Sequence, residues 1–306
     1  MKATATAHAN IALVKYWGKR DEARLLPQAA SLSIALDKLL TTTTVELGVN
    51  EDSFELDGKA SDLKRARALL DAAGIRAKAR IVSRNDFPTA AGLASSASGF
   101  AALAVAASAA AGLKRSEAEL SALARLGSGS ATRSVPGGWA VWENERARQV
   151  FPPDHLPLRC VIAVCAAGPK DVGSRDGMLS TKQTSPYHEA WIEQCRRDLP
   201  QALVMLADRD LPALGALAER NALRMHADAL AADPPLLYWQ PATVACLQAL
   251  RSGKKRIAWA TIDAGPHVVA LCAPDDAPEV EKLLNGISGV EEVLVCAPAG
   301  AARVLP

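Results

Sequence analysis

PTAAGLASSASG, residues 88–99, joins a proline, two glycines and three serines to small apolar residues just before a long alanine-rich run. A glycine- and serine-rich turn that opens a helix favours anions, because free backbone N–H groups and the helix dipole point toward the ligand. Small side chains let the backbone approach a phosphate closely. The same residues also suit an ordinary capped helix, and neither a P-loop nor a dinucleotide fingerprint is present. A phosphate cradle and a plain helix start therefore remain as alternatives.

The elements around this stretch predict an α+β fold rather than a regular alternation of strands and helices. In the first half we expect strands at 11–17, 31–36, 41–47, 77–83 and 137–143, and helices at 61–74 (capped by Ser61), from Ser95 onward and at 115–127. In the second half we expect strands at 158–165, 256–263, 267–272 and 290–296, with helices over most of 176–252 and near 275–285. Three prolines at 152–158 predict a joint between residues 1–157 and residues 158–306.

Composition excludes several classes of protein. Of the 306 residues, 49% are hydrophobic and 22% are charged, with a net charge of +2, which argues against disorder and against general binding to nucleic acid or to a membrane surface. None of the six cysteines forms a C-x-x-C pair, so neither a disulfide framework nor a zinc site is indicated. With no signal-peptide layout, and with an alanine-rich run too weakly apolar to span a bilayer, we expect a cytoplasmic protein with no membrane or nucleic-acid partner.

Four further stretches place cations or a carboxylate beside small polar residues. They are NIALVKYWGKRD (10–21), ARLGSGSATRSVPGGWAVW (124–142), AAGPKDVGSRDGM (166–178) and ATIDAGPHV (260–268). Each has an ordinary explanation when taken alone, as solvated lysines, a polar loop or a turn-forming aspartate. Taken together with the helix start, they suit phosphoryl transfer to a hydroxyl. That chemistry needs charge neutralisation, in-line positioning and an acceptor for the hydroxyl proton.

The pattern P-x-x-x-G-L-x-S-S-x-S at 88–98 resembles the phosphate loop of the GHMP kinase superfamily. Together with NIALVKYWGKRD, GSGSATRS, SRDGM and TIDAGP in the same order, it makes the chain similar to the diphosphomevalonate decarboxylase family. The resemblance implies conversion of (R)-5-diphosphomevalonate to isopentenyl diphosphate, ADP, phosphate and CO₂ in the mevalonate pathway, with ATP and Mg²⁺. It also implies a homodimer of a two-lobed fold with a deep central cleft. The N-terminal half would resemble ribosomal protein S5 domain 2, and the C-terminal half would be of ferredoxin-like type.

The resemblance also assigns roles to individual residues. Asp263 matches the aspartate that faces the C3 hydroxyl of the substrate, and Arg133 matches the arginine that holds its carboxylate. Residues lining the cleft near this aspartate are matched by Asn10 and Lys15. Positions around the substrate are matched by Tyr16, Lys19, Ser128, Gly129, Ser130, Ser174 and Arg175. The ATP phosphate loop would contain Gly92, Ser95, Ser96 and Ser98, with the contacts of each serine left open.

Three residues depart from the family pattern: Ala29 where asparagine is expected, Pro136 where a bulkier residue is usual, and His267 where asparagine is common. None removes a proposed catalytic group, but Ala29 and His267 could reshape the cleft. A related kinase or decarboxylase acting on mevalonate or its monophosphate therefore remains the alternative. A nucleotide-binding scaffold without activity is the third reading, and the presence of both Asp263 and Arg133 disfavours it.

Overall fold

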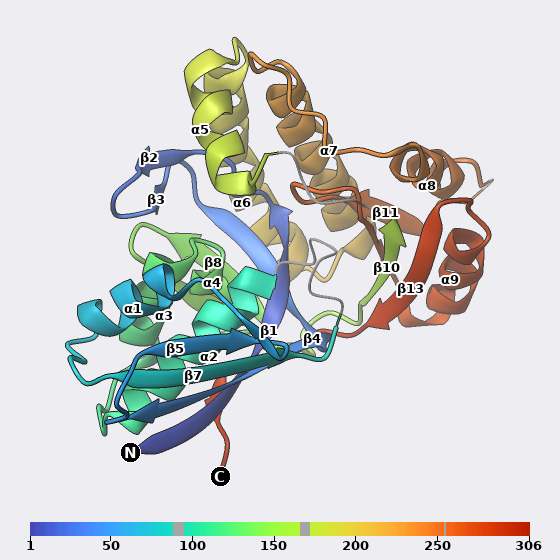
Figure 1. Cartoon of the computed structure of the whole chain (residues 1–306). Helices are drawn as coiled ribbons and strands as arrows, with labels where there is room; N and C mark the ends of the chain where they lie inside the picture. Colours follow the sequence, from blue (N-terminus) through green and yellow to red (C-terminus); the bar gives the residue numbers. More distant parts are fainter. Residues whose placement is uncertain (88–94, 166–171, 254) are drawn as a thin grey trace.

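The computed structural model describes residues 1–87, 95–165, 172–253 and 255–306, which form two large β-sheets, a separate two-stranded sheet and the helices packed on them (Figure 1). The larger sheet has the order β14-β1-β4-β7-β5-β6, and β8 and β9 extend it from β4. Its pairs are antiparallel except for β5 and β7. The strands are β1 (Lys2–Val14), β4 (Ser31–Leu47), β5 (Ser53–Leu56), β6 (Lys59–Ala60), β7 (Ala79–Asn85), β8 (Trp139–Glu143), β9 (Arg146–Phe151) and β14 (Arg303–Val304).

Alanine-rich α2 lies against this sheet because its small side chains allow a close approach to the strands. Its buried residues form one hydrophobic cluster with strands β1, β4 and β7 and with the neighbouring helices. The helices of this half are α1 (Leu63–Ala72), α2 (Ser95–Ala110), α3 (Glu117–Gly127) and the short α4 (Ala131–Ser134). A hairpin of β2 (Lys19–Asp21) and β3 (Leu26–Pro27) stands apart from the sheet.

Two expectations for this half are corrected. The cap of α1 is Asp62 rather than Ser61, because the Asp62 carboxylate accepts the backbone N–H of Lys64 at 2.9 Å. The segments 31–36 and 41–47 are one strand, β4, rather than two. The pairing of β4 with β1 shifts at a bulge in β4. At this bulge the backbone N–H of Asp37 donates to the carbonyl of Ala297 at 2.9 Å, so a segment near the C-terminus replaces β1 as the partner of β4.

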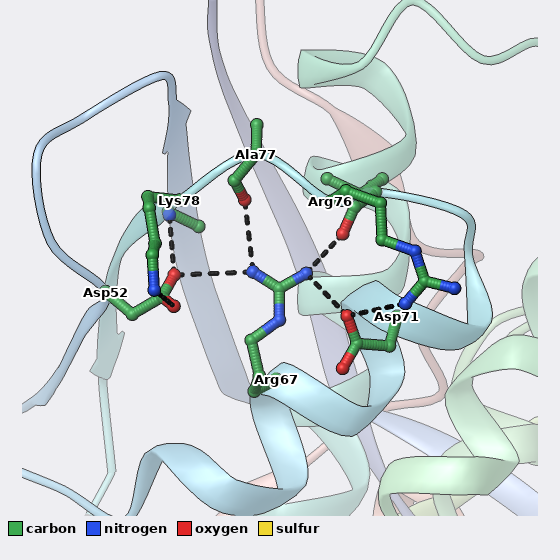
Figure 2. Close-up of polar contacts among 8 residues, drawn as sticks. Asp52, Arg67, Asp71, Arg76, Ala77 and Lys78 are labelled. Carbon is green, nitrogen blue, oxygen red and sulfur yellow. Dashed lines mark hydrogen bonds and ion pairs between the residues drawn. The ribbon is translucent and has the colours of Figure 1, made fainter.

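A polar network fastens α1 to the strands beside it (Figure 2). The guanidinium of Arg67 contacts Asp52 at 3.3 Å and Asp71 at 3.1 Å, and donates to the carbonyl of Ala77 at 3.1 Å. The Asp52 carboxylate also accepts the backbone N–H of Ala79, the first residue of β7, at 2.8 Å. The network therefore sets the position of α1, which carries a cation into the cavity described below.

The smaller sheet is antiparallel, with the order β11-β12-β10-β13. Its strands are β10 (Arg159–Cys165), β11 (Ala258–Thr261), β12 (Val268–Cys272) and β13 (Val290–Cys296). The helices of this half are α5 (Ser174–Thr184), α6 (His188–Ala207), α7 (Leu211–Leu230), α8 (Pro241–Arg251) and α9 (Ala277–Asn285), with the 3₁₀ turn η2 (Pro274–Asp276). The expected strand at 256–263 is shorter, and ends before Asp263 at a turn.

One hydrophobic core joins the two halves. It combines Leu13 and Ile34 of the larger sheet with Ile162 of the smaller sheet and Leu214 of α7. Helices α8 and α9 pack in a separate cluster with the smaller sheet. No helix in the described ranges is both long enough and apolar enough to cross a membrane.

Candidate active site

Elements from both halves line one cavity of about 370 Å³. This volume is in the range of small-molecule sites. The predicted site residues that line it are Asn10, Lys15, Tyr16, Lys19, Ser95, Ser96, Ser128, Gly129, Ser130, Arg133, Ser174, Arg175 and Asp263. Gly92 falls outside the described residues. Segments more than two hundred residues apart in the sequence thus meet in one place.

The charges of the cavity are strongly unbalanced. Among the described lining residues, the cations are Lys15, Lys19, Arg65, Arg133 and Arg175, and the one carboxylate is that of Asp263. This excess contrasts with the net charge of +2 for the whole chain. A cavity lined mainly by one sign of charge concentrates ligands of the opposite sign. The site is therefore suited to a ligand that carries several negative charges.

Lys15 and Asp263 form an ion pair at this cavity. The Lys15 ammonium lies 2.6 Å from Asp263 Oδ1 and donates to the carbonyl of Ala12 at 2.7 Å. The Lys15 side chain is 1% exposed, whereas that of Asp263 is 35% exposed. Burial lowers the pKa of Lys15, and the adjacent Asp263 carboxylate opposes that shift. A carboxylate that is partly open to the cavity and held by a buried cation can accept a proton from a ligand hydroxyl.

In the described part of the chain, the guanidinium of Arg133 is held by an amide and a hydroxyl oxygen and by no carboxylate. Its Nε donates to Asn10 Oδ1 at 3.1 Å and its Nη1 donates to Ser31 Oγ at 2.7 Å. Asn10 in turn donates to the carbonyl of Ser130 at 3.1 Å and to Ser134 Oγ at 2.8 Å, so it fixes the whole α4 turn. Burial lowers the pKa of Arg133 to about 10, and the charge of Asp263 opposes this shift. A buried, oriented guanidinium of this kind is suited to a carboxylate ligand.

Tyr16 packs against Gly129, which stands between Ser128 and Ser130. Its ring meets Trp142 edge-on, with 4.5 Å between centroids, and a Cβ added at Gly129 would lie 2.9 Å from its hydroxyl. Glycine at 129 is therefore required for this close approach. The Tyr16 hydroxyl is buried and has no hydrogen-bond partner in the described structure. Burial raises the pKa of Tyr16, so the hydroxyl keeps its proton and can donate it to a bound anion.

Lys19 enters the cavity from the β2–β3 hairpin. Its side chain is 2% exposed, and the ammonium lies 2.6 Å from Glu22 Oε2. The Glu22 side chain is 39% exposed. A bound phosphate would compete with Glu22 for this ammonium, because both are anions.

The serines at the start of α2 have different surroundings. Ser95 and Ser96 line the cavity, and Ser96 Oγ lies 3.4 Å from Ser128 Oγ. Ser98, in contrast, is fully buried and its hydroxyl lies 2.6 Å from that of Thr41 in β4. Ser98 is therefore placed against the sheet and not among the lining residues.

The donor set of this site suits one kind of metal ion. The described residues contain no group of three or more His, Cys, Asp or Glu side chains arranged to hold a metal. The hydroxyls of Ser95 and Ser96 are hard oxygen donors at the N-terminus of α2. Mg²⁺ prefers oxygen and is commonly bound by few protein ligands together with substrate phosphates. These residues therefore fit Mg²⁺ bound jointly with a nucleotide.

Several lining residues were not expected from the sequence: Ala12, Trp17, Leu25, Arg65, Met178, Met225 and Ala264. Arg65 is the chemically important one, because it brings a cation from α1 to the serines of α2. Its guanidinium donates to the carbonyl of Gly127 and lies 4.6 Å from the centre of the Phe100 ring. No local motif marks Arg65, since it stands among other charged residues of α1.

The three departures from the family pattern lie around the cavity rather than in its lining. His267 Nδ1 accepts the backbone N–H of Cys165 at 3.1 Å, which ties the turn after Asp263 to the end of β10. The carbonyl of Pro136 accepts from Gln149 at 3.1 Å. Ala29 is partly buried against the cluster that contains Trp17. Each therefore has a structural role in this fold.

Two family models match the chain, one on each half. The model described as a diphosphomevalonate decarboxylase-like N-terminal domain matches residues 7–150. The model described as a mevalonate 5-diphosphate decarboxylase C-terminal domain matches residues 160–298. A diphosphomevalonate decarboxylase from Homo sapiens is 36% identical over 318 residues, which cover 90% of this chain and 78% of the human protein. The corresponding protein from Gibberella zeae is 34% identical over 335 residues, covering 95% of this chain and 87% of that protein.

Solved structures give the same result. A complex of MDDEF with MVAPP, AMPPCP and magnesium has a TM-score of 0.92 at 37% identity, covering 100% of this chain and 99% of that one. Mevalonate diphosphate decarboxylase from Staphylococcus aureus has a TM-score of 0.91 at 34% identity, covering 100% of this chain and 98% of that one. These structures confirm the expected α+β fold and are consistent with the two-lobed GHMP type.

Proposed function

The chain belongs to the diphosphomevalonate decarboxylase family, and we propose that the cation-lined cavity is where its reaction takes place. The enzyme decarboxylates mevalonate diphosphate with ATP and Mg²⁺, a step of the mevalonate pathway. The observation that carries the proposed site is the Lys15–Asp263 ion pair facing a cavity with four further cations. The substrate carries a diphosphate and a carboxylate, so its charge is complementary to this lining.

We assign the two anionic ends of the substrate to different cations. Arg133 would hold the carboxylate, because its guanidinium is already fixed by Asn10 and Ser31. The guanidinium also interacts electrostatically with Asp263, which places the substrate carboxylate near that residue. The diphosphate would lie toward Tyr16 and Lys19, with Ser128, Gly129, Ser130, Ser174 and Arg175 around it. This arrangement would leave the C3 hydroxyl beside Asp263.

Phosphoryl transfer to that hydroxyl is the first chemical step that we propose. The C3 oxygen attacks the γ-phosphorus of ATP, the bond to the β-phosphate oxygen breaks and ADP leaves. Asp263 takes the proton of the hydroxyl, while the contact with Lys15 orients the carboxylate beforehand. Ser95 and Ser96 would hold the triphosphate and Mg²⁺ at the start of α2. The metal supplies charge neutralisation on the transferred phosphate.

Decarboxylation follows from the same geometry. The C3–O bond breaks and inorganic phosphate leaves with the electron pair, so positive charge develops at C3. The bond to the carboxyl carbon then supplies its electrons to a new C=C bond, and CO₂ is released with isopentenyl diphosphate. Arg133 would keep the breaking bond aligned, and the negative charge of Asp263 would stabilise the developing cation.

Asp263→Asn tests these roles. Turnover should fall by about 10²- to 10⁴-fold, because the amide cannot take the hydroxyl proton. Dissociation constants for ATP and diphosphomevalonate, measured by calorimetry, should stay near the wild-type values. Asp275→Asn makes the same chemical change at an exposed position in η2 and should leave turnover unchanged. Turnover close to wild type in Asp263→Asn would contradict the assignment. Assaying mevalonate, its 5-phosphate and its 5-diphosphate side by side, with ADP and CO₂ both followed, tests the substrate.

Three further features are proposals. We propose that residues 1–157 and 158–306 act as two lobes, the first holding the ATP phosphates and the second carrying Asp263. We also propose that the protein acts in the cytoplasm, because its six cysteines are free and buried as expected in a reducing compartment. Finally, we propose that it forms a homodimer, which light scattering on the purified protein would test.

A further inference from the structure

Asn221 on α7 is fully buried and does not line the cavity, yet it holds a residue that does. Its Oδ1 accepts the backbone N–H of Lys15 at 2.8 Å. Its Nδ2 donates to Asp198 Oδ2 on α6 at 2.8 Å. One amide therefore links two helices to the end of β1.

We propose that Asn221 is a positioning residue for the reaction: by holding the backbone of Lys15, it keeps the Lys15 ammonium on Asp263. The proposal rests on the roles assigned above to Lys15 and Asp263. Asn221 is not a catalytic residue, since it acts through Lys15 rather than on a bound substrate.

The backbone N–H of Lys15 needs this partner because the sheet no longer supplies one. Strand β1 ends at Val14, after a shift in its register with β4. A buried N–H without an acceptor is strongly unfavourable, and the Asn221 side chain supplies that acceptor. The contact joins residues 206 positions apart, so it fixes the end of β1 to the second half of the chain.

The position of this backbone decides where the ammonium lies. Lys15 Nζ donates both to the carbonyl of Ala12 at 2.7 Å and to Asp263 Oδ1 at 2.6 Å. The hydroxyl of Thr261 donates to the same carbonyl at 3.2 Å, which connects β11 to β1 just before Asp263. A shift of the Lys15 backbone of about 1 Å would break at least one of the two short contacts of its ammonium.

The direction of the Asn221 amide is fixed by Asp198. Because a carboxylate only accepts, Asp198 turns the Nδ2 group toward itself and the carbonyl oxygen toward Lys15. Asp198 is held by Gln194 at 2.7 Å and by Arg224 at 3.4 Å. An aspartate at 221 could not donate to Asp198, and a leucine could neither donate nor accept.

Loss of this support has a consequence at Asp263. Among the described residues, the charged and titratable groups that interact with Asp263 are Lys15, Arg133 and His226. If the Lys15 ammonium moves away, Asp263 loses the contact that orients its carboxylate at the cavity. The loss should appear in kcat with little change in either KM, whereas a general loosening of the fold would lower the melting temperature without this split.

Asn221→Leu is the main test, using the full-length enzyme with ATP, Mg²⁺ and diphosphomevalonate. We expect kcat to fall by about 10- to 100-fold with both KM values within about threefold. Adding Asn221→Leu to Lys15→Met should cause little further loss, because both changes remove the same interaction.

A matched control separates positioning from a general loosening of α7. Asp210 caps α7 by accepting the N–H of Ala213 at 3.0 Å and lies on the surface. Asp210→Ala should lower the melting temperature but leave kcat unchanged. The same fall in kcat in Asp210→Ala and Asn221→Leu would overturn the proposal.

A variant of Asp198 keeps the test decisive if Asn221→Leu does not fold. Asp198→Ala removes the acceptor that fixes the direction of the Asn221 amide, so it should lower kcat by about tenfold with both KM values nearly unchanged. Wild-type kcat in Asp198→Ala, or in folded Asn221→Leu, overturns the proposal. If Lys15→Met and Asp263→Asn themselves keep wild-type turnover, it is instead the assigned function of the ion pair that fails.

Discussion

At the scale of single residues, Arg133 shows how the chain prepares a cation for a ligand. The guanidinium is buried, and Asn10 and Ser31 accept from its Nε and Nη1. Its plane also lies 5.8 Å from the centre of the Trp142 ring. These contacts use the fork of the guanidinium, which a lysine ammonium does not possess. The orientation of the charge, and not only its sign, is therefore built into the fold.

Arg133→Lys tests this requirement for orientation. The variant keeps the charge but loses the paired contacts to Asn10 and Ser31, so kcat/KM for diphosphomevalonate should fall by about 10²-fold or more. Steady-state kinetics with CO₂ detection measures the change. Arg197→Lys is the control, because Arg197 is exposed and forms an ion pair with the surface residue Glu193 of the same helix. Equal kinetics for Arg133→Lys and the wild type would show that charge alone is sufficient.

Sequence motifs predicted most of the residues that line the cavity, but not those that hold them in place. Lys15, Arg133 and Asp263 each stand in a recognisable short motif. Asn221 and Ser31 carry no local signal, because their partners lie 206 and 102 positions away in the sequence. Such contacts depend on the tertiary fold and cannot be derived from periodicity or spacing.

At the scale of elements, the turn that carries Asp263 depends on the start of α8. The hydroxyl of Thr243 donates to the carbonyl of Pro266 at 2.6 Å and accepts the backbone N–H of Gln240 at 3.1 Å. Gly265 closes the turn by donating to the carbonyl of Asp263 at 2.7 Å. One buried hydroxyl thus connects a helix cap to the turn that carries Asp263.

Thr243→Val removes the hydroxyl, and with it the hydrogen bonds to Gln240 and to Pro266. We expect the free energy of unfolding to fall by about 1–2 kcal/mol and turnover to fall as well, because the Asp263 turn loses an anchor. Urea unfolding and steady-state kinetics measure the two effects. Ser116→Ala is the matched control, since Ser116 caps α3 through Glu119 on the surface. It should lower stability by about 1 kcal/mol without changing turnover. A fully active Thr243→Val would contradict the anchoring role.

Elements with strong periodicity were predicted well, and those that depend on distant partners were not. The alanine-rich α2 and the strand β10 lie within a residue of their expected starts. Strand β1 was expected only at 11–17 but runs Lys2–Val14, and β2, β3, β5, β6, β9 and β14 were not expected. Most of these missed strands have two to four residues, too few for a recognisable alternation of apolar and polar residues. The continuity of β4 was also missed, since the bulge that joins its two parts pairs with residues near the C-terminus.

At the scale of the whole molecule, the two halves share one core, and the chain end returns to the first sheet. β14 pairs with β1, and the backbone N–H of Ala302 donates to the carbonyl of Val135 at 3.0 Å. Helix α7 contributes both to the shared core and, through Asn221, to Lys15. The ion pair of Lys15 and Asp263 is therefore supported by the same helix that completes the shared core.

A buried histidine of α7, His226, predicts how the free energy of unfolding depends on pH. His226 of α7 is 2% exposed and packs against Trp239, with 5.0 Å between ring centroids. Burial, followed by the charge of Lys15, lowers the pKa of His226 from 6.5 to about 4. Between those values the unfolded chain binds a proton that the folded protein does not. The histidine's contribution is therefore complete above about pH 6.5 and is lost as the pH falls toward 4.

The loss attributable to His226 should reach about 3 kcal/mol, from 1.36 kcal/mol for each unit of pKa difference. Urea unfolding of the wild type and of His226→Gln at pH 7.5 and pH 4 measures it. Carboxylates such as Asp52, whose pKa is lowered by its backbone and lysine contacts against the effect of burial, weaken both proteins equally. The difference in the free energy of unfolding between the two pH values should thus be smaller in the variant by about 3 kcal/mol. Equal losses in the two proteins would mean that the folded state admits the proton at His226, and so that α7 opens locally near pH 5.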